Sequence, residues 1–308
     1  MRHVAYKKIA ETVESLCVKA AYELPADVLS ALQKAAKSET NALAKKILEQ
    51  LIENARLAKA ERIPLCQDTG LAVVFVEQGS EVIIDCPAGK SAVDAIQEGV
   101  AAGYEKGYLR KSVVAEPLDK RKNTGTNTPA IIYWSLGPPT ASPRKAGLRS
   151  ASQGEAKRGG GAGDKLKITF LAKGGGCENK SAFRMFRPTA GVDEVADWIV
   201  EVVKNAGADA CPPFIVGVGI GGDFELSALL SKKALTRSID QPSADSFYAD
   251  LERDLLSRVN RLNVGPQGLG GDTTALAVLI ETAPCHIASL PVAVNIECHS
   301  HRHQTVII

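Results

Sequence analysis

The hydrophobic pattern of the chain changes its period near residue 65. Before this point, apolar residues recur at the spacing of an α-helix with one buried face, as in the segment 41–61. Pro25 and the polar segment 38–40 interrupt the pattern, and residues of these types begin or end helices. The sequence therefore predicts an N-terminal helical segment, residues 1–62, with about three helices between residues 4 and 61.

After residue 65, strand-like runs alternate with helical patterns. Runs rich in β-branched residues that end in turn residues predict strands at 71–79, 81–85, 130–134, 165–173, 214–222, 273–283 and 290–298. Amphipathic patterns predict helices at 91–106, 192–207, 223–235 and 244–262. This alternation predicts an α/β protein, a mixed α/β domain with a helical N-terminal segment. The length of 308 residues allows one large or two modest domains, and we expect a single domain over residues 1–308.

The charge and the apolar content of the chain argue against several classes of protein. The formal net charge is +2, so no strong field favours nucleic acid or an anionic membrane. No stretch approaches the ~20 consecutive apolar residues of a membrane span. Charges recur through the opening "MRHVAYKKIAETVESL", which lacks the apolar core of a signal peptide. We therefore expect a cytoplasmic protein that binds neither nucleic acid nor a membrane.

The segment 137–164 differs in composition from the rest of the chain. Leu148 is its only large apolar residue, and its five basic residues outnumber its two acidic ones. A segment of this composition buries too little apolar surface to order itself. Because it joins two predicted strands, we expect a flexible basic insertion at the tip of a hairpin. A solvated loop is favoured over a site for RNA or another polyanion.

Seven cysteines are spread along the chain at wide spacings. Their odd number argues against a disulfide framework, and the lack of any Cys-x-x-Cys argues against a structural zinc finger. Three of them lie in turn-like segments far apart in the sequence, "PLCQDTG", "ACPPF" and "ECHSHRH". Iron–sulfur clusters take thiolates from distant loops, so a cluster is one interpretation and plain buried cysteines are the other.

Two glycine-rich segments suggest close approach to the backbone. The three glycines of "AKGGGCENK", residues 172–180, leave backbone N–H groups open to a ligand. The second segment, "GVGIGGDFE", follows a predicted strand and precedes a helix, but its spacing is not G-x-G-x-x-G. Close packing of backbones is therefore favoured there over a dinucleotide site, although a dinucleotide-dependent oxidoreductase stays an alternative.

Several motifs in order resemble one family. The segments are "PLCQDTG", "GYLRKSVVAEPL", "NTGTNTPA", "AKGGG", "ACPPF", "GPQGLGG" and "CHSHR". They resemble the α subunit of a two-subunit class I fumarate hydratase, in the iron–sulfur hydro-lyase family that also includes L-tartrate dehydratase. The resemblance covers nearly the whole chain except residues 137–164. It implies the α-domain fold of that family and the reversible hydration of fumarate to L-malate.

The resemblance also implies a cofactor and its ligands. Cys66, Cys211 and Cys298 match the cysteines that hold a [4Fe-4S] cluster, which leaves one iron open to the substrate. Cys177 stands where many such fumarases carry serine, so we expect it near the site but not as a ligand. Cys285 matches no consistent cysteine of the family and is also left out.

Further matching residues are expected to contact the substrate. Gln67 and Asp68 follow the first ligand cysteine, Arg110 matches an arginine that binds a substrate carboxylate, and Gly176 would offer its N–H group. Asp68 and His286 are the expected catalytic residues, with the histidine close to the aspartate. Taken alone, Asp68 is equally explained as the cap of a turn.

The resemblance finally implies a partner, because single-chain relatives carry the catalytic base, a threonine, in a C-terminal domain that this chain lacks. We expect a separate β subunit, an active site between the two chains, and an assembly of two α and two β subunits. L-Tartrate dehydratase is the alternative within the family, although tartrate enzymes tend to carry tryptophan after the last ligand cysteine. A non-catalytic metal-binding or regulatory protein is the alternative from another class.

Overall fold

The computed structural model describes residues 1–137 and 163–308. The predicted basic insertion, apart from its ends, lies outside the described residues. Contacts within the chain divide it into two compact units. Unit 1 holds Met1–Lys19, Ala72–Leu171 and Gln304–Ile308, and unit 2 holds Ala20–Leu71 and Ala172–His303. The single domain expected over the whole chain stays a prediction.

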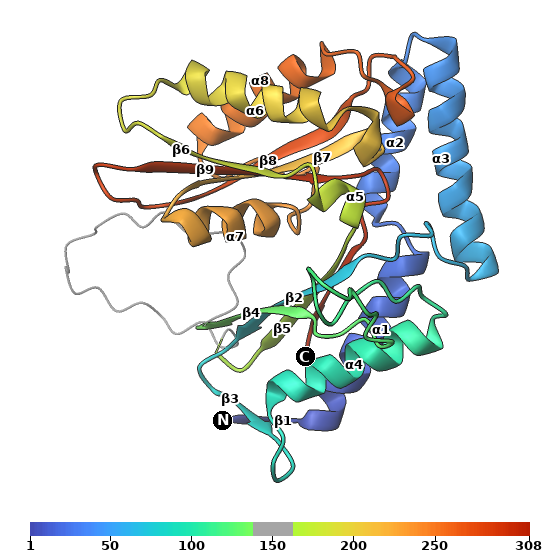
Figure 1. The fold of residues 1–308 in the computed structure, drawn as a ribbon, viewed down its shortest axis with the longest axis vertical. Coiled ribbons are helices and arrows are strands. Elements are labelled where there is room, and N and C mark those ends of the chain that lie inside the picture. The colour runs from blue at the N-terminus through green and yellow to red at the C-terminus, as the bar shows by residue number, and fades with distance from the viewer. Residues whose placement is uncertain (138–162) are drawn as a thin grey trace. The chain divides into compact units, whose positions relative to one another are not determined.

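The N-terminal helical segment is confirmed. It consists of α1 (Tyr6–Tyr22), α2 (Ala26–Ser38) and α3 (Ala42–Glu61), drawn in blue in Figure 1. Pro25 precedes α2, and the Asn41 side chain caps α3 by accepting from the N–H of Leu43 at 2.9 Å and of Ala44 at 3.1 Å. The helices therefore begin at the two interruptions in the sequence pattern. No helix in the described part of the chain is long and apolar enough to cross a membrane.

Unit 1 is built on a four-stranded sheet with the order β10-β5-β2-β4. The bounds are β2 (Leu71–Gln78), β4 (Ile131–Leu136), β5 (Leu166–Lys173) and β10 (His303–Ile307). Helix α4 (Ala92–Lys106) is preceded by its N-cap residue, Ser91, which forms a capping box with Asp94. A second small sheet pairs β1 (Arg2–Ala5) in parallel with β3 (Val82–Asp85). The sequence pattern missed β1 and β10, and it extended the first helix over part of β1.

The expected hairpin around the basic insertion is wrong. Strand β4 pairs in parallel with β2, from Val73 opposite Ile131 to Gln78 opposite Leu136. Strand β2 thus lies between β4 and β5, so the two strands that flank the insertion are not neighbours. The physical reason is that β2 is buried along both faces, which is the pattern of a central strand.

Unit 2 is built on a mixed sheet with the order β6-β9-β7-β8. Strand β7 is parallel to β8, whereas β9 is antiparallel to both β7 and β6. The bounds are β6 (Ala182–Phe186), β7 (Phe214–Gly221), β8 (Ala275–Ala283) and β9 (Leu290–Glu297). Helices α6 (Val192–Ala206) and α8 (Ser246–Asn260) lie along one face, and α7 (Phe224–Ala234) lies on the other (Figure 1). The mixed α/β class is therefore confirmed.

The core of unit 2 explains the stability of this sheet. Ile199 and Val203 of α6 are fully buried against Val216 and Val218 of β7 and their neighbours. Burying one such side chain contributes about 1.5–3 kcal/mol. The sequence pattern missed β6 and the one-turn helix α5 (Gly175–Glu178), both of which are short.

The glycines of "GVGIGG" serve packing. A Cβ on Gly217 would lie 2.1 Å from the Ser231 carbonyl oxygen, and one on Gly219 would lie 2.0 Å from the Ser227 carbonyl oxygen. Both oxygens belong to α7, which therefore rests directly on the backbone of β7. Close packing is confirmed, and the sequence support for a dinucleotide loop is lost.

Candidate active site

The turn that follows α3 is joined to the glycine loop, residues 174–177, by Asp68. One carboxylate oxygen, Oδ2, accepts a hydrogen bond from the Gly175 N–H at 2.8 Å, and Oδ1 accepts one from the Gly70 N–H at 3.0 Å. Gly70 has φ +81°, and a Cβ on it would lie 2.8 Å from the Ala172 carbonyl carbon. Only glycine fits there, so the turn and the strand before the glycine loop are in direct backbone contact.

The same turn presents three polar side chains in sequence. The Cys66 thiol lies 3.3 Å from Oε1 of Gln67, and Gln67 itself is exposed. Arg302, which is 1% exposed, donates to the main-chain oxygen of Asp68. The turn is thus fixed from two sides, by the glycine loop and by the segment that follows Cys298.

The Cys211 turn is fixed by the Cys298 segment in the same way. Cys211 ends the short 3-10 helix Gly207–Ala210 in a left-handed conformation, φ 53°, and the Pro212–Pro213 bond that follows is cis. The main-chain N–H of His299 donates to the Cys211 carbonyl oxygen at 3.4 Å, and the ring Nδ1 of His299 lies 3.1 Å from the same oxygen. Cys211 and the residue after Cys298 are therefore neighbours.

Two of the expected ligand cysteines, Cys66 and Cys298, act electrostatically on the third, Cys211. Burial raises the pKa of the Cys211 thiol, and the charges of Cys298 and Cys66 raise it further, as does that of Asp68. Such an influence requires proximity, so Cys66 and Cys298, which come from separate segments of unit 2, both lie near Cys211. All three are free thiols.

A second, tighter group lies beside Cys298. Among the described residues, the ligand atoms of Cys177, Glu297 and Cys298 all lie within 4.8 Å of one another. A hydrogen bond between the two thiols raises the pKa of Cys177 and lowers that of Cys298. Cys177 also donates to the Ala210 carbonyl oxygen at 3.4 Å, so it lies at the site, as expected from the sequence.

These two groups are alternatives for a metal, and they differ in the charges around them. The ammonium of Lys173 lies 3.5 Å from Oε2 of Glu297, where it pairs with that carboxylate. A cation bound between Cys177 and Glu297 would face this ammonium at short range. Free thiols from separate loops are instead the donor set of an iron–sulfur cluster, whose size also separates its ligands more widely than a single ion does. Cys66, Cys211 and Cys298 are free thiols, a donor type that suits such a cluster, and their role as its ligands stays a prediction.

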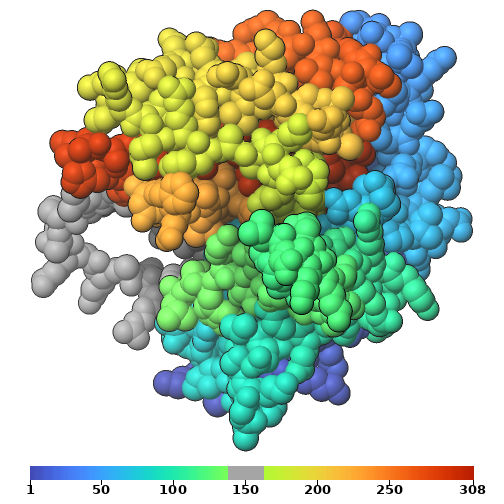
Figure 2. All heavy atoms as spheres, in the orientation of Figure 1, coloured from blue at the N-terminus to red at the C-terminus, as the bar shows by residue number. Residues whose placement is uncertain are grey.

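Unit 2 by itself does not place two of the predicted site residues in this group. Arg110 is exposed in unit 1, after α4, and its role stays a prediction. His286 is exposed in the connection from β8 to β9, which forms a tip at the edge of unit 2 (Figure 2). Cys298 follows the opposite end of β9, and eight residues of strand, Leu290–Glu297, span roughly 26 Å. Within one chain, therefore, His286 does not lie beside Asp68, and its catalytic role also stays a prediction.

Gly176, by contrast, lies in the glycine loop that Asp68 contacts. It lies in the first turn of α5, directly after Gly175, and is exposed. N–H groups at the start of a helix have no partner within the helix, so they are free to point toward a ligand. In α5, the Gly175 N–H donates to Asp68, and the role of the Gly176 N–H stays a prediction.

Sequence reasoning missed Lys173, Glu297 and Arg302. Each is nearly or fully buried beside a residue of the predicted site. The signal that points to them is a charged residue inside an otherwise apolar strand, as in "FLAKGGG" and "AVNIEC". Because buried charges require partners, such residues predict ion pairs near the strand ends where they occur.

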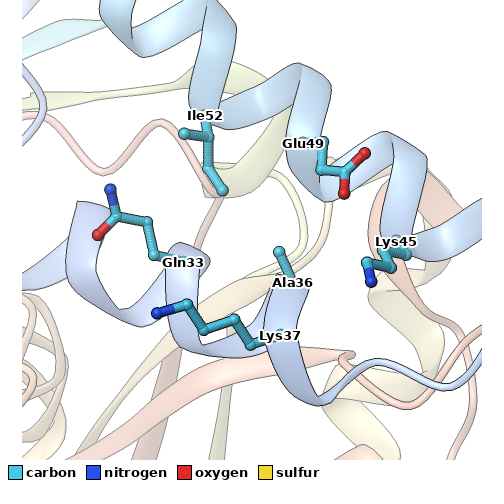
Figure 3. A pocket seen from close by; sticks show the side chains of 6 residues that line it. All are labelled: Gln33, Ala36, Lys37, Lys45, Glu49 and Ile52. Carbon is cyan, nitrogen blue, oxygen red and sulfur yellow. The ribbon is translucent and has the colours of Figure 1, made fainter.

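A surface pocket lies elsewhere in unit 2. It lies between α2 and α3 and is lined by Gln33, Ala36, Lys37, Lys45, Glu49 and Ile52 (Figure 3). None of the candidate site residues lines it. Its charged side chains stand on two exposed helix faces, which is the ordinary surface of such a helix pair.

Known proteins resemble this chain over nearly its full length. Residues 10–307 match the family model described as fumarate hydratase (Fumerase). A putative L(+)-tartrate dehydratase subunit alpha from Methanocaldococcus jannaschii is 38% identical over 299 residues, which are 96% of this chain and 95% of the relative. The L(+)-tartrate dehydratase subunit alpha of Escherichia coli O157:H7 is 29% identical over 306 residues, 99% of this chain and 92% of the relative. The chain therefore belongs to the fumarate hydratase family of hydro-lyases and is of the α-subunit type.

Proposed function

We propose that this chain is the α subunit of a [4Fe-4S]-dependent hydro-lyase that adds water reversibly to fumarate to give L-malate. The observation that supports this proposal best is the meeting of three free thiols with Asp68 and the glycine loop. Cys66, Cys211 and Cys298 come from separate segments of unit 2, and Cys66 and Cys298 both lie within electrostatic reach of Cys211. Such a site combines thiolate ligands with groups that recognise an anionic substrate.

Cys66, Cys211 and Cys298 would hold the cluster. When bound, it supplies an open iron that acts as a Lewis acid toward the hydroxyl group of malate. The chain's own residues then position the substrate. Asp68 fixes the glycine loop, so that the Gly176 N–H can donate to a substrate carboxylate.

Gln67 and Arg110 complete the proposed contacts with the substrate. The exposed amide of Gln67 lies in the cysteine turn and can donate to a carboxylate oxygen. A guanidinium such as that of Arg110 binds a carboxylate through two parallel hydrogen bonds. We include His286 only as a catalytic residue that a second polypeptide copy would have to supply, because its own chain places it at the far end of β9.

L-Tartrate is the second candidate substrate. The curated relatives described above are named as tartrate dehydratase subunits, and the same chemistry would act on a substrate with one more hydroxyl group. Against this stands His299, in the position where tartrate enzymes tend to carry tryptophan. Its ring lies 3.1 Å from the Cys211 carbonyl oxygen and 3.1 Å from the Gln267 amide nitrogen, so the residue at this position shapes the Cys211 turn.

A β subunit is part of the proposal. The relatives are named as alpha subunits, which fits an active site that a second chain completes. That chain would supply the catalytic base, and the assembly would hold two copies of each subunit in the cytoplasm. On this account the α chain alone binds the cluster and turns over poorly.

Parallel assays of the α and β subunits, purified together without oxygen, test the function. Loss of fumarate is followed by its ultraviolet absorbance, and oxaloacetate formed from L-tartrate is followed by a coupled reaction. The proposal predicts a larger kcat/KM for fumarate and malate than for L-tartrate. The reverse preference would assign the chain to tartrate, and no turnover of either substrate by an iron-loaded complex would favour a non-catalytic metal-binding protein.

A further inference from the structure

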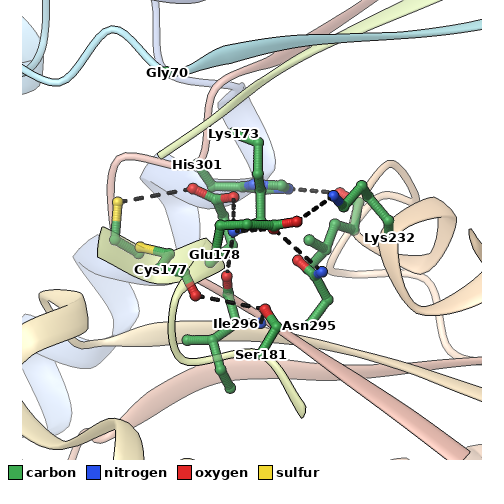
Figure 4. Close-up of polar contacts among 12 residues, drawn as sticks. Gly70, Lys173, Cys177, Glu178, Ser181, Lys232, Asn295, Ile296 and His301 are labelled. Atoms are coloured by element: carbon green, nitrogen blue, oxygen red, sulfur yellow. Dashed lines mark hydrogen bonds and ion pairs between the residues drawn. The ribbon is translucent and has the colours of Figure 1, made fainter. Parts of the chain in front are cut away.

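A buried lysine connects the two halves of the candidate site. Lys173 ends β5, is 0% exposed, and donates to the Ile296 carbonyl oxygen of β9 at 2.7 Å. Its ammonium lies 3.3 Å from Oε2 of Glu178 and 3.5 Å from Oε2 of Glu297 (Figure 4). One cation therefore contacts α5 and β9 at once.

Lys173 and Glu297 each lie next to a segment of the candidate site. Lys173 directly precedes the glycine loop, and Glu297 directly precedes Cys298. The ion pair between them therefore joins the segment that would contact the substrate to the segment that carries a proposed cluster ligand. Ser181 adds to the link by accepting the Ile296 N–H at 3.2 Å.

Of the two carboxylates beside Lys173, Glu178 has a second cation in ion-pair contact, whereas Lys173 is the one such cation of Glu297 among the described residues. Glu178 has a second cationic partner, Lys232, whose ammonium lies 2.5 Å from its Oε1, and the Asn295 amide lies 3.4 Å from its Oε2. Glu297 is 0% exposed, and one of its oxygens lies 3.9 Å from the Cys298 sulfur. Without Lys173, a negative charge in contact with Cys298 would lose its nearest cation.

We propose that Lys173 is a positioning residue of this site, which fixes the glycine loop against the Cys298 strand and balances the charge of Glu297 beside the Cys298 sulfur. The inference rests on the proposed function, because it assigns Lys173 an effect on the cluster. Nearby charges set the reduction potential of an iron–sulfur centre, and outer residues orient its ligands. A plain buried ion pair would instead affect stability alone.

The test uses three variants of the α and β complex, Lys173→Met, Glu297→Gln and the double variant, loaded with iron without oxygen at pH 8. The midpoint potential of the cluster is measured by a redox titration followed by electron paramagnetic resonance. We expect a lower potential in Lys173→Met, because the unbalanced carboxylate disfavours the more negative, reduced cluster. We expect a higher potential in Glu297→Gln and a value near the wild type in the double variant. Iron per chain should fall most in Lys173→Met.

The double variant keeps the test decisive if Lys173→Met does not fold, since removing both charges avoids a buried unpaired ion. Glu281→Gln is the matched control. Glu281 lies 3.4 Å from the partly buried Arg237, which also donates to the Ile280 carbonyl oxygen at 3.1 Å, in an ion-pair group on β8. This control should lose stability without any shift in potential.

The outcomes separate the two claims. If the wild type holds the cluster and Glu297→Gln and the double variant have the same midpoint potential as the wild type, the inference about Lys173 is overturned and the proposed function is not. A wild-type complex that holds no iron–sulfur cluster would overturn the proposed function and the inference together. Shifts of opposite sign in the two single variants, absent in Glu281→Gln, would establish the role of Lys173.

Discussion

Asp68 is expected to hold the site together before it takes part in any reaction. Its carboxylate accepts the Gly70 N–H at 3.0 Å and the Gly175 N–H at 2.8 Å. A hydrogen bond to a charged group contributes about 1.5–3 kcal/mol, and we use the lower value because Asp68 is partly exposed. Asp68→Ala should therefore destabilise the protein by about 3 kcal/mol in total.

This loss has a measurable size. About 3 kcal/mol corresponds to a fall in Tm of roughly 6 °C for a long chain, and Asp68→Asn, which keeps one acceptor oxygen, should lose about half as much. Thermal unfolding followed by circular dichroism gives the Tm, and iron per chain is measured on the same samples. Both variants should also retain less iron, because the Cys66 turn is no longer fixed to the glycine loop.

Asp223→Ala supplies the control for Asp68. Asp223 caps α7 in the same unit by accepting the Leu226 N–H at 2.8 Å, and loss of such a cap costs about 1 kcal/mol. Its iron content should stay at the wild-type level. The reasoning about Asp68 is refuted if Asp68→Ala melts with the wild type and binds iron equally well.

Three further predictions concern the rest of the chain. Burial lowers the pKa of His301 to about 4, so the unfolded chain, with a pKa of about 6.5, binds more protons in acid. Stability should therefore fall by about 3 kcal/mol as the pH drops from 6.5 to 4, and denaturant titrations should show a weaker fall in His301→Gln. Gly219→Ala should abolish soluble folded protein, because its Cβ would lie 2.0 Å from the Ser227 carbonyl oxygen, whereas Gly191→Ala, with nothing within 4 Å, should express normally. Arg110→Lys should raise KM for fumarate by about tenfold or more through loss of a bidentate contact, and an unchanged KM would remove Arg110 from the site.

Local patterns in the sequence predicted most of the fold. Pro25 and the polar segment 38–40 separate the N-terminal helices, and α6, α7 and α8 follow their amphipathic patterns closely. The missed strands depend on distant partners instead. Strand β1 forms only against β3, some eighty residues later, and β10 begins with the polar His303 and Gln304, so neither segment shows a strand pattern on its own.

For the candidate site, the sequence indicated the segments but not the contacts between them. The cysteine turns and the glycine loop stood out as unusual local combinations, and the family resemblance gave them roles. The contacts that join them could not be predicted, because Lys173 and Glu297 are far apart in the sequence and meet only after β5 and β9 have formed. The distance between His286 and Asp68 is likewise set by the length of β9 rather than by any motif.

The most direct test of the whole account is the content of iron and acid-labile sulfide per chain after anaerobic purification and reconstitution. The account predicts about four of each in the wild type. It also predicts a sharp loss in Cys66→Ala, Cys211→Ala and Cys298→Ala but not in Cys177→Ala. Zinc in place of iron would contradict the account. Retention of the cluster in Cys66→Ala and Cys211→Ala, together with its loss in Cys177→Ala, would also contradict it and would assign the metal to the Cys177, Glu297 and Cys298 group.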